Sequence, residues 1–165
     1  MATAYKTPGV YIEEIPKFPP SIASVETAIP AFIGYTQKAD NLVANDLHLK
    51  PKRISSMVEY EKYFGVAQLE TGITVDVTVT QVGGVTTEQT ATAKLLESAR
   101  SKHVMYYALQ MFFANGGGPY YIVSVNPFKA TVGGALVETE LSGGLDTLKK
   151  EDEPTLIVFP EAQSL

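Results

Sequence analysis

NGGGPYYIVSV, residues Asn115–Val125, places three consecutive glycines between an apolar helix-like run and an apolar strand-like run. Loops that bind phosphate follow a strand and open a helix, whose free N–H groups and positive dipole end face the anion. Here the glycines follow a helix and lead into a strand, and no lysine–serine or lysine–threonine pair comes after them. The stretch therefore predicts a structural turn rather than a nucleotide-binding site.

Each residue of this turn has a structural role in that interpretation. Asn115 and Gly116 end the helix, with Gly116 in the left-handed conformation that costs glycine little. Gly117 and Gly118 allow a tight reversal, and Pro119 prevents the helix from continuing because it lacks an amide hydrogen. We therefore expect the chain to return directly as a strand.

The elements on either side of the turn alternate between helix and strand. Ala99–Ala114 is the strongest helix candidate, and because only its first turn is charged we expect it to be mostly covered. Three further runs are almost continuously apolar, as in strands that are buried on both faces. These predicted buried strands are Ala28–Thr36, Tyr120–Val125 and Thr155–Pro160.

Two shorter helices complete the pattern. Ser55 or Ser56 can cap a helix that runs through Tyr63 and ends at Gly65. A second short helix is expected near Leu145–Lys150, after a glycine-rich stretch. Apolar strands separated by helices predict an α/β fold, with a layered sheet that contains parallel pairs.

Residues 73–93 form a predicted β-hairpin that is inserted in this fold. Val75, Val77 and Val79 alternate with polar residues, which is the two-residue period of a strand. Gly83–Gly84 has the composition of a two-residue hairpin turn. Because the second half of the hairpin carries fewer large apolar residues, we expect a surface protrusion.

The first 27 residues differ from the α/β domain that follows, which we expect to span residues 28–165. Four prolines disfavour a helix in this segment, yet it contains more apolar residues than a disordered tail usually does. An extended apolar arm of this kind needs a surface to lie against. Physical reasoning leaves two interpretations open: the arm packs across its own domain, or it adds a strand to a neighbouring chain.

The composition of the 165 residues argues against several classes of function. Without cysteine the chain can form no disulfide, thiolate metal site or cysteine nucleophile. A formal charge of −5, with no basic run longer than Lys50–Arg53, argues against nucleic acid as a partner. No apolar run approaches the ~20 residues that span a bilayer, so direct membrane insertion is not expected.

Residues with catalytic or metal-binding chemistry do not form a recognisable motif. His48 is expected in a solvated loop and His103 in the first turns of the long helix, and neither has ligand-forming neighbours. Glu13 and Glu14 are adjacent, so in a strand they would point to opposite faces. Glu151–Glu153 is expected to form a surface turn. We therefore predict no catalytic, cofactor-binding or metal-binding residues and a protein that is not an enzyme.

Five stretches together resemble the sheath proteins of contractile tails, which occur in phages, tailocins and extracellular contractile injection systems. They follow the family's order and are YKTPGVYIEEI (Tyr5–Ile15), TAIPAFIGYT (Thr27–Thr36), KPKRISSMVEYEKYFG (Lys50–Gly65), MFFANGGGPYYIVSV (Met111–Val125) and GLDTLKKEDEPTLIVFPE (Gly144–Glu161). These stretches are most similar in sequence to the injection-system branch, such as the sheaths of the antifeeding prophage and the Photorhabdus virulence cassette.

The resemblance implies a structural, non-enzymatic subunit. Sheath subunits of this family polymerise as stacked rings around an inner tube, and contraction of the sheath drives the tube into a target cell. The implied partners are further copies of the chain, the inner tube protein, and baseplate or cap proteins. The implied location is the bacterial cytoplasm during assembly, and then a phage tail or a released tail-like particle.

The resemblance also implies a role for the arm, because the terminal arms of sheath subunits interlace with their neighbours in a shared β-sheet. The residues that match this inter-subunit arm are Tyr5, Pro8, Gly9, Val10, Tyr11, Ile12 and Ile15. The resemblance therefore favours strand donation to a neighbouring chain over packing on the arm's own domain.

The chain departs from the family in its length. Family members are considerably longer, and their distal half completes the α/β domain. The 165 residues therefore correspond to the amino-terminal portion of a sheath protein or to a short relative. The hairpin at residues 73–93 has no clear counterpart and is interpreted as a decoration of one branch. Two other functions stay open: an α/β ligand-binding or enzymatic domain with a structural tail, and a sheath-like adaptor that ends the tube.

Overall fold

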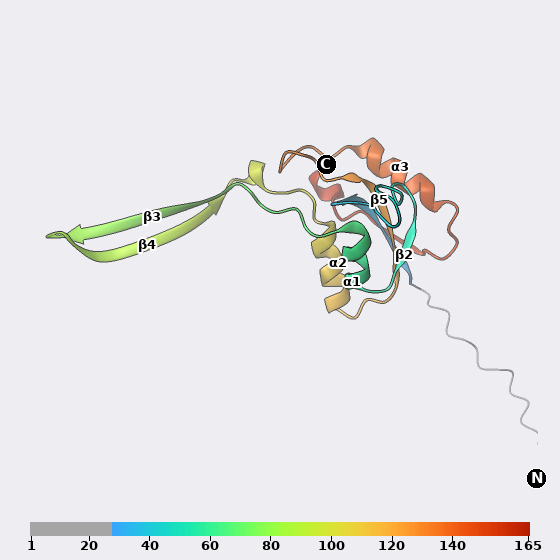
Figure 1. Cartoon of the computed structure of the whole chain (residues 1–165), viewed down its shortest axis with the longest axis horizontal. Helices are drawn as coiled ribbons and strands as arrows, with labels where there is room; N and C mark the ends of the chain where they lie inside the picture. Colours follow the sequence, from blue (N-terminus) through green and yellow to red (C-terminus); the bar gives the residue numbers. More distant parts are fainter. Residues whose placement is uncertain (1–27) are drawn as a thin grey trace, which may run out of the picture.

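The computed structural model describes residues 28–165, and the arm predicted for residues 1–27 lies outside the described residues. The described chain contains a four-stranded sheet, three α-helices and a separate two-stranded hairpin (Figure 1). The predicted α/β fold is therefore confirmed. No helix within the described range is both long and apolar enough to cross a lipid bilayer.

The central sheet has the strand order β2-β5-β1-β6. Its strands are β1 (Pro30–Thr36), β2 (Lys52–Ile54), β5 (Tyr120–Pro127) and β6 (Leu156–Val158). Phe32 of β1 lies opposite Ile122 of β5 and opposite Val158 of β6, and both pairings are parallel. β2 pairs antiparallel with β5. The predicted parallel pairs are thus present, and β2 and β6 form the two edges of the sheet.

Helices cover both faces of this sheet. They are α1 (Met57–Phe64), α2 (Met105–Ala114) and α3 (Glu138–Leu148). α1 and α2 pack on the face that carries Phe32 and Ile122, whereas α3 packs on the face that carries Ile33 and Val123. Since successive strand residues point to opposite faces, covering both faces buries nearly all of β1 and β5, as their apolar runs predicted.

Local capping signals set the ends of α1. The Ser56 hydroxyl accepts a hydrogen bond from the Glu59 amide at 3.2 Å, which satisfies one of the free N–H groups at the start of the helix. The Glu59 carboxylate accepts a hydrogen bond from the Ser55 amide at 2.9 Å. Gly65 ends the helix with a φ of +83°. The predicted helix and both of its end signals are therefore confirmed.

α2 begins later than predicted, at Met105 rather than Ala99. Among the residues before it, the Ser101 amide donates a hydrogen bond to the Glu70 carboxylate at 3.0 Å. Residues 97–99 form only a short 3-10 helix. α2 is also less covered than expected, since the side chain of Met111 is 68% exposed.

α3 begins earlier than predicted, at Glu138 rather than near Leu145. It includes Gly143 and Gly144, which have low intrinsic helix propensity. Burial of Leu141 against the sheet stabilises this first half of the helix and outweighs the weak local preference. A second short 3-10 helix, Ala162–Ser164, follows β6.

β6 contradicts the prediction of a buried strand at Thr155–Pro160. Leu156 and Ile157 are 56% and 48% exposed. The strand lies at an edge of the sheet and pairs with β1 through three residues. An edge strand has a neighbour on one side only, so its apolar side chains stay partly uncovered.

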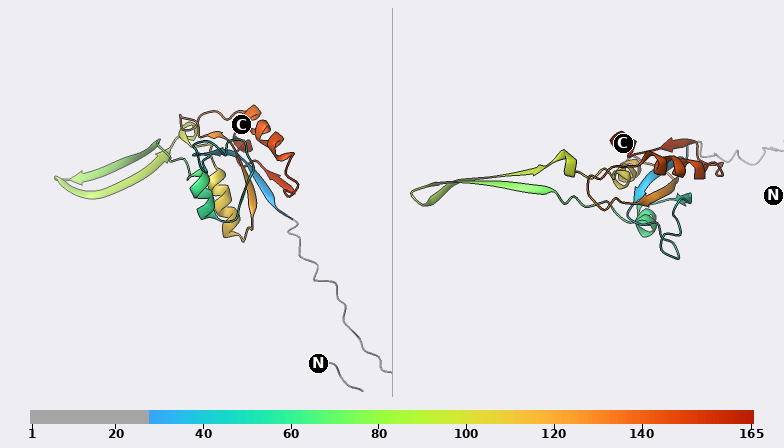
Figure 2. Two further views of the ribbon diagram at one scale, coloured as in Figure 1. Left: turned by 45° about the vertical axis from the view of Figure 1, so that its right-hand side comes forward. Right: turned by 90° about the horizontal axis from the view of Figure 1, so that it is seen from above.

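The predicted hairpin is present and is two residues longer than expected at its carboxyl end. β3 (Ile73–Val82) and β4 (Val85–Leu95) pair antiparallel around Gly83–Gly84. The two glycines have positive φ angles of +60° and +82°, as a tight hairpin turn of this length requires. The hairpin extends far from the sheet and helices (Figure 2), and every residue of β3 is exposed.

Candidate functional site

The residues predicted to form the inter-subunit arm lie outside the described residues: Tyr5, Pro8, Gly9, Val10, Tyr11, Ile12 and Ile15. Glu13 and Glu14 lie in the same segment. The described residues begin at Ala28, shortly before β1. Ala28 and Pro30 line a groove on one face of the sheet. The point at which the arm joins the domain is therefore next to this groove.

The predicted turn Asn115–Pro119 closes α2 with two specific hydrogen bonds. The Gly116 amide donates to the Phe113 carbonyl at 3.0 Å, and the Gly117 amide donates to the Phe112 carbonyl at 2.9 Å. This pair of bonds defines a Schellman motif, which satisfies carbonyl groups that a helix end leaves free. Gly116 has a φ of +82°, the left-handed conformation expected for it.

The next two glycines of the turn have different surroundings. A Cβ atom on Gly117 would lie 2.4 Å from the ring of Phe112, so a side chain does not fit there. No described atom lies within 4 Å of a Cβ position on Gly118. Asn115 strengthens the helix end, because its Nδ2 donates to the Met111 carbonyl at 2.7 Å. The turn thus forms the carboxyl end of α2. The free amide groups that bind phosphate lie at the start of a helix, so this turn does not provide them.

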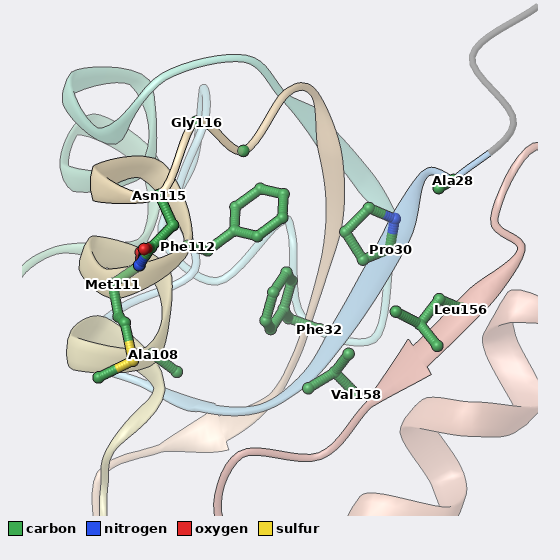
Figure 3. Close-up of a pocket in the computed structure, with 11 residues that line it drawn as sticks. Ala28, Pro30, Phe32, Ala108, Met111, Phe112, Asn115, Gly116, Leu156 and Val158 are labelled. Atoms are coloured by element: carbon green, nitrogen blue, oxygen red, sulfur yellow. The ribbon is translucent and has the colours of Figure 1, made fainter.

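A groove of about 500 Å³ opens between α2 and β6, over β1 (Figure 3). Its lining consists of Ala28 shortly before β1, Pro30 and Phe32 from β1, Ala108, Met111 and Phe112 from α2, Asn115, Gly116 and Gly117 from the turn, and Leu156 and Val158 from β6. None of these described lining residues is charged. The groove therefore suits an apolar segment of chain and offers no group for acid–base chemistry.

β6 presents apolar side chains on both faces of the sheet edge. Leu156 and Val158 lie on the groove side, as Figure 3 shows. Ile157 points to the opposite face, where it lines a second hollow of about 280 Å³ with Leu145 and Leu148 of α3. Exposed apolar residues on both faces of an edge strand mark this edge as a candidate interaction site.

A buried polar cluster, which no sequence pattern predicted, lies near the carboxyl ends of β1 and β5. The Oε2 atom of Glu161 accepts a hydrogen bond from the Tyr35 amide at 2.9 Å, and its Oε1 atom lies 3.4 Å from Nδ1 of His103. The Lys129 amide donates to Nε2 of His103 at 3.1 Å. Because Nε2 accepts, the ring proton is on Nδ1, and His103 donates to Glu161.

The outer half of the cluster is more exposed to solvent. The Tyr35 hydroxyl donates to Glu140, and Nζ of Lys129 lies 2.8 Å from Oε2 of Glu140. Burial alone would raise the pKa of Glu140, but the hydrogen bonds from Lys129 and Tyr35 outweigh it and hold the pKa below its ordinary value. Burial and the hydrogen bond to Glu140 raise the pKa of the Tyr35 hydroxyl. The hydrogen bond to Glu140 likewise raises the pKa of Lys129.

This cluster lies where ligands commonly bind in α/β folds, outside the carboxyl ends of the strands. However, its central groups, Glu161 and His103, are buried. They form hydrogen bonds with each other and with backbone amides. Within residues 28–165 no group of three or more potential ligands could hold a metal ion. The arrangement therefore joins the segment after β6 to β1 and to the start of α2.

Both histidines have surroundings that differ from those predicted. His48 is half-buried rather than solvated, and its Nε2 donates to the Val125 carbonyl at 2.7 Å. His103 precedes α2 rather than lying within it, and its side chain is buried. The partners of both rings come from distant parts of the sequence, so no local pattern marks them.

In the predicted surface turn at Glu151–Glu153, Glu153 accepts a hydrogen bond from the Tyr121 hydroxyl at 2.8 Å.

No sequence pattern predicted β6 and the groove as a candidate interaction site. The apolar run of β6 was recognisable, but its place at the edge depends on strand order, which no local pattern reveals. Compared with models of known protein families and with curated proteins, the chain matches none.

Proposed function

We propose that this protein is a structural subunit of a contractile sheath, and that it polymerises with copies of itself around an inner tube. The observation that carries this proposal is the β6 edge, where Leu156 and Ile157 expose apolar side chains on opposite faces beside an uncharged groove. The resemblance of five sequence stretches to contractile-tail sheaths supports this class of assembly. Contraction of such a sheath would drive the tube into a target cell.

The open edge of β6 suits the addition of a strand from another chain. Among the described residues, β6 pairs with β1 alone, so its outer backbone groups face away from the sheet. A strand added here would gain backbone hydrogen bonds, and its side chains would lie beside Leu156 on one face and Ile157 on the other. The added strand should therefore carry apolar residues at both odd and even positions.

The arm has a sequence of this kind. Val10 and Ile12 alternate with Tyr11, so a strand formed by these residues has apolar side chains on both faces. Pro8 and Pro16 flank the segment and limit the length of the strand, because proline cannot donate to a β-ladder. We therefore assign the arm of a neighbouring copy as the strand that pairs with β6.

Deletion of residues 1–20 tests the proposal. We expect the deletion variant to stay folded and monomeric, whereas the full chain forms long tubular assemblies that electron microscopy detects. If the arm packs on its own domain instead, its deletion lowers the free energy of unfolding and leaves assembly unchanged. Normal tubes formed by the deletion variant would therefore contradict the proposal.

A matched pair of substitutions tests the role of β6. Leu156→Glu places a charge at the groove, and Leu42→Glu places the same charge on an apolar residue that is 89% exposed in the loop after β1. Both side chains are exposed, so we expect circular dichroism and unfolding curves like those of the wild type. Assemblies should be lost in Leu156→Glu and kept in Leu42→Glu. Equal assembly of the two variants would exclude β6 from the interface.

A further inference from the structure

The end of α2 carries an asparagine followed by a glycine, Asn115 and Gly116, and this pair occurs only once in the sequence. The other three asparagines precede leucine, aspartate and proline, and they are Asn41, Asn45 and Asn126. An asparagine before glycine loses its side-chain amide more readily than one before any other residue, because glycine has no Cβ atom to hinder attack by its own backbone nitrogen. The chemistry of the chain therefore makes Asn115 its most reactive asparagine.

The reaction needs only groups of the chain and water. The Gly116 nitrogen gives up its proton to a base and bonds to Cγ of Asn115. The bond from Cγ to Nδ2 then breaks, the proton returns to the leaving nitrogen, and ammonia departs. Water opens the resulting five-membered succinimide ring and leaves an aspartate or an isoaspartate at this position. The net change is one water gained and one ammonia lost, without oxidation or reduction.

The closed turn holds both reacting groups away from each other. The Gly116 amide donates to the Phe113 carbonyl at 3.0 Å, and Nδ2 of Asn115 donates to the Met111 carbonyl at 2.7 Å. Asn115 has a ψ of +18°, which directs the Gly116 nitrogen away from Cβ of Asn115. The succinimide ring requires these two atoms on the same side of the Cα–C bond. Ring closure therefore requires that both hydrogen bonds break and that the last turn of α2 opens.

Opening of this turn is a local event. Asn115 is exposed, and so is the side chain of Met111 one helical turn before it. The ends of helices open at a much lower free energy than the core of a fold, which here includes the adjoining strand β5. Water thus reaches the opened turn while the sheet stays folded.

We propose that Asn115 is a deamidation site that the Schellman turn at the end of α2 controls. The closed turn is unreactive, so the rate of conversion equals the rate in the open chain multiplied by the fraction of molecules in which the turn is open. Conversion of Asn115 therefore measures how often this helix end opens.

The product prevents the turn from closing as before. A carboxylate cannot donate to the Met111 carbonyl, and its negative charge lies beside the free carbonyls and the negative dipole end of α2. It also adds a charge to a groove whose described lining has none (Figure 3). A converted subunit should therefore bind an apolar segment less well, and this consequence alone rests on the proposed assembly.

Peptide mass spectrometry tests the site, because conversion of an amide to an acid changes the mass of the peptide. The full-length wild type is incubated at mildly alkaline pH, once in buffer and once in guanidinium chloride, and each asparagine is followed over time. In denaturant we expect Asn115 to convert at least about tenfold faster than any other asparagine, because only Asn115 precedes glycine. In buffer its conversion should slow by at least about fivefold, because the turn is closed in most molecules.

Two alanine substitutions provide a matched pair that leaves Asn115 and Gly116 in place. A Cβ atom on Gly117 would lie 2.4 Å from the Phe112 ring, so Gly117→Ala should open the turn, whereas a Cβ atom on Gly118 meets open space. In buffer we expect Asn115 to convert at least about threefold faster in Gly117→Ala than in Gly118→Ala. In denaturant the two variants should convert equally, which shows that the chemistry itself is unchanged.

Three results would overturn the inference: equal rates for the wild type in buffer and in denaturant, equal rates for the two folded variants, or earlier conversion of another asparagine. The comparison of wild type in buffer and in denaturant needs no variant, so it decides the matter even where Gly117→Ala does not fold. These measurements use unassembled protein and are separate from the assembly proposal. If Asn115 converts as expected and no tubes form, the site stands and the assembly proposal fails. If tubes form and the turn does not slow conversion, the site is wrong and the assembly proposal stands.

Discussion

The Oε1 atom of Glu161 lies 3.4 Å from Nδ1 of His103, although the two residues are 58 positions apart in the chain. Both side chains are buried, and the second carboxylate oxygen of Glu161 accepts a hydrogen bond from the Tyr35 amide. A buried carboxylate is tolerated only where its hydrogen bonds are complete. This pairing therefore connects the segment after β6 to the centre of the sheet.

Glu161→Gln should lower the free energy of unfolding by about 2–3 kcal/mol, because the amide NH₂ group would face a hydrogen-bond donor in a buried site. Urea unfolding followed by circular dichroism measures the change. Glu138→Gln serves as the control, since Glu138 is exposed and its substitution should change stability by less than about 0.5 kcal/mol. Equal stability of the two variants would show that the buried pair has no structural role.

Two adjacent glycines of α3 should respond in opposite directions to alanine. A Cβ atom on Gly144 would lie 2.6 Å from Cγ2 of Ile33 and 2.6 Å from Cγ1 of Val125, so α3 would have to move away from the sheet. Gly144→Ala should therefore destabilise the fold by about 1–3 kcal/mol. Gly143 faces open space, and Gly143→Ala should stabilise the helix by about 0.5–1 kcal/mol. Thermal unfolding of both variants checks the signs, and a shared sign would refute the packing described for α3.

The neighbouring residues Tyr120 and Tyr121 should also differ when the hydroxyl is removed. The Tyr120 hydroxyl is buried without a hydrogen-bond partner among the described residues, whereas the Tyr121 hydroxyl donates to Glu153 at 2.8 Å. Tyr120→Phe should raise the free energy of unfolding by about 1 kcal/mol, because it removes an unsatisfied polar group. Tyr121→Phe should lower it by about 0.5–1 kcal/mol. Denaturant unfolding at neutral pH distinguishes these outcomes, and a loss of stability in Tyr120→Phe would indicate an unidentified partner for that hydroxyl.

The contribution of Glu140 to stability should depend on pH. Its pKa lies below the ordinary value of 4.5 in the folded protein, since hydrogen bonds from Lys129 and Tyr35 outweigh the effect of burial. A carboxyl group with a lowered folded pKa stabilises the fold above its unfolded pKa, and this stabilisation is lost as the pH falls through the folded pKa. Solvent screening reduces the effect of a partly exposed pair, so we expect about 0.5–1 kcal/mol.

Unfolding of the wild type and of Glu140→Gln between pH 3 and pH 7 measures this effect. The difference in stability should be constant above about pH 5 and should shrink below the ordinary pKa of 4.5. Asp146→Asn is the control, because Asp146 forms an exposed ion pair with Lys149 and its removal should matter little at any pH. A difference between wild type and Glu140→Gln that grows in acid would contradict the assigned contacts.

Short-range sequence signals specify the helices and turns whose ends depend on near neighbours. Ser56 caps α1 and Gly65 ends it, and each acts on residues within one helical turn. Gly83–Gly84 sets the hairpin turn, and Gly116 sets the end of α2 through its own backbone conformation. Such signals are short-range, so a pattern of a few residues is sufficient to predict them.

Long-range packing sets which of these elements are covered and which polar groups come into contact. Leu156 and Ile157 belong to an apolar run like that of β5, yet strand order places them at an exposed edge. Glu161 reaches the Tyr35 amide across 126 positions of sequence. Burial and long-range hydrogen bonds depend on which segments pack together in the whole chain, and residues next to one another in sequence carry little information about that packing.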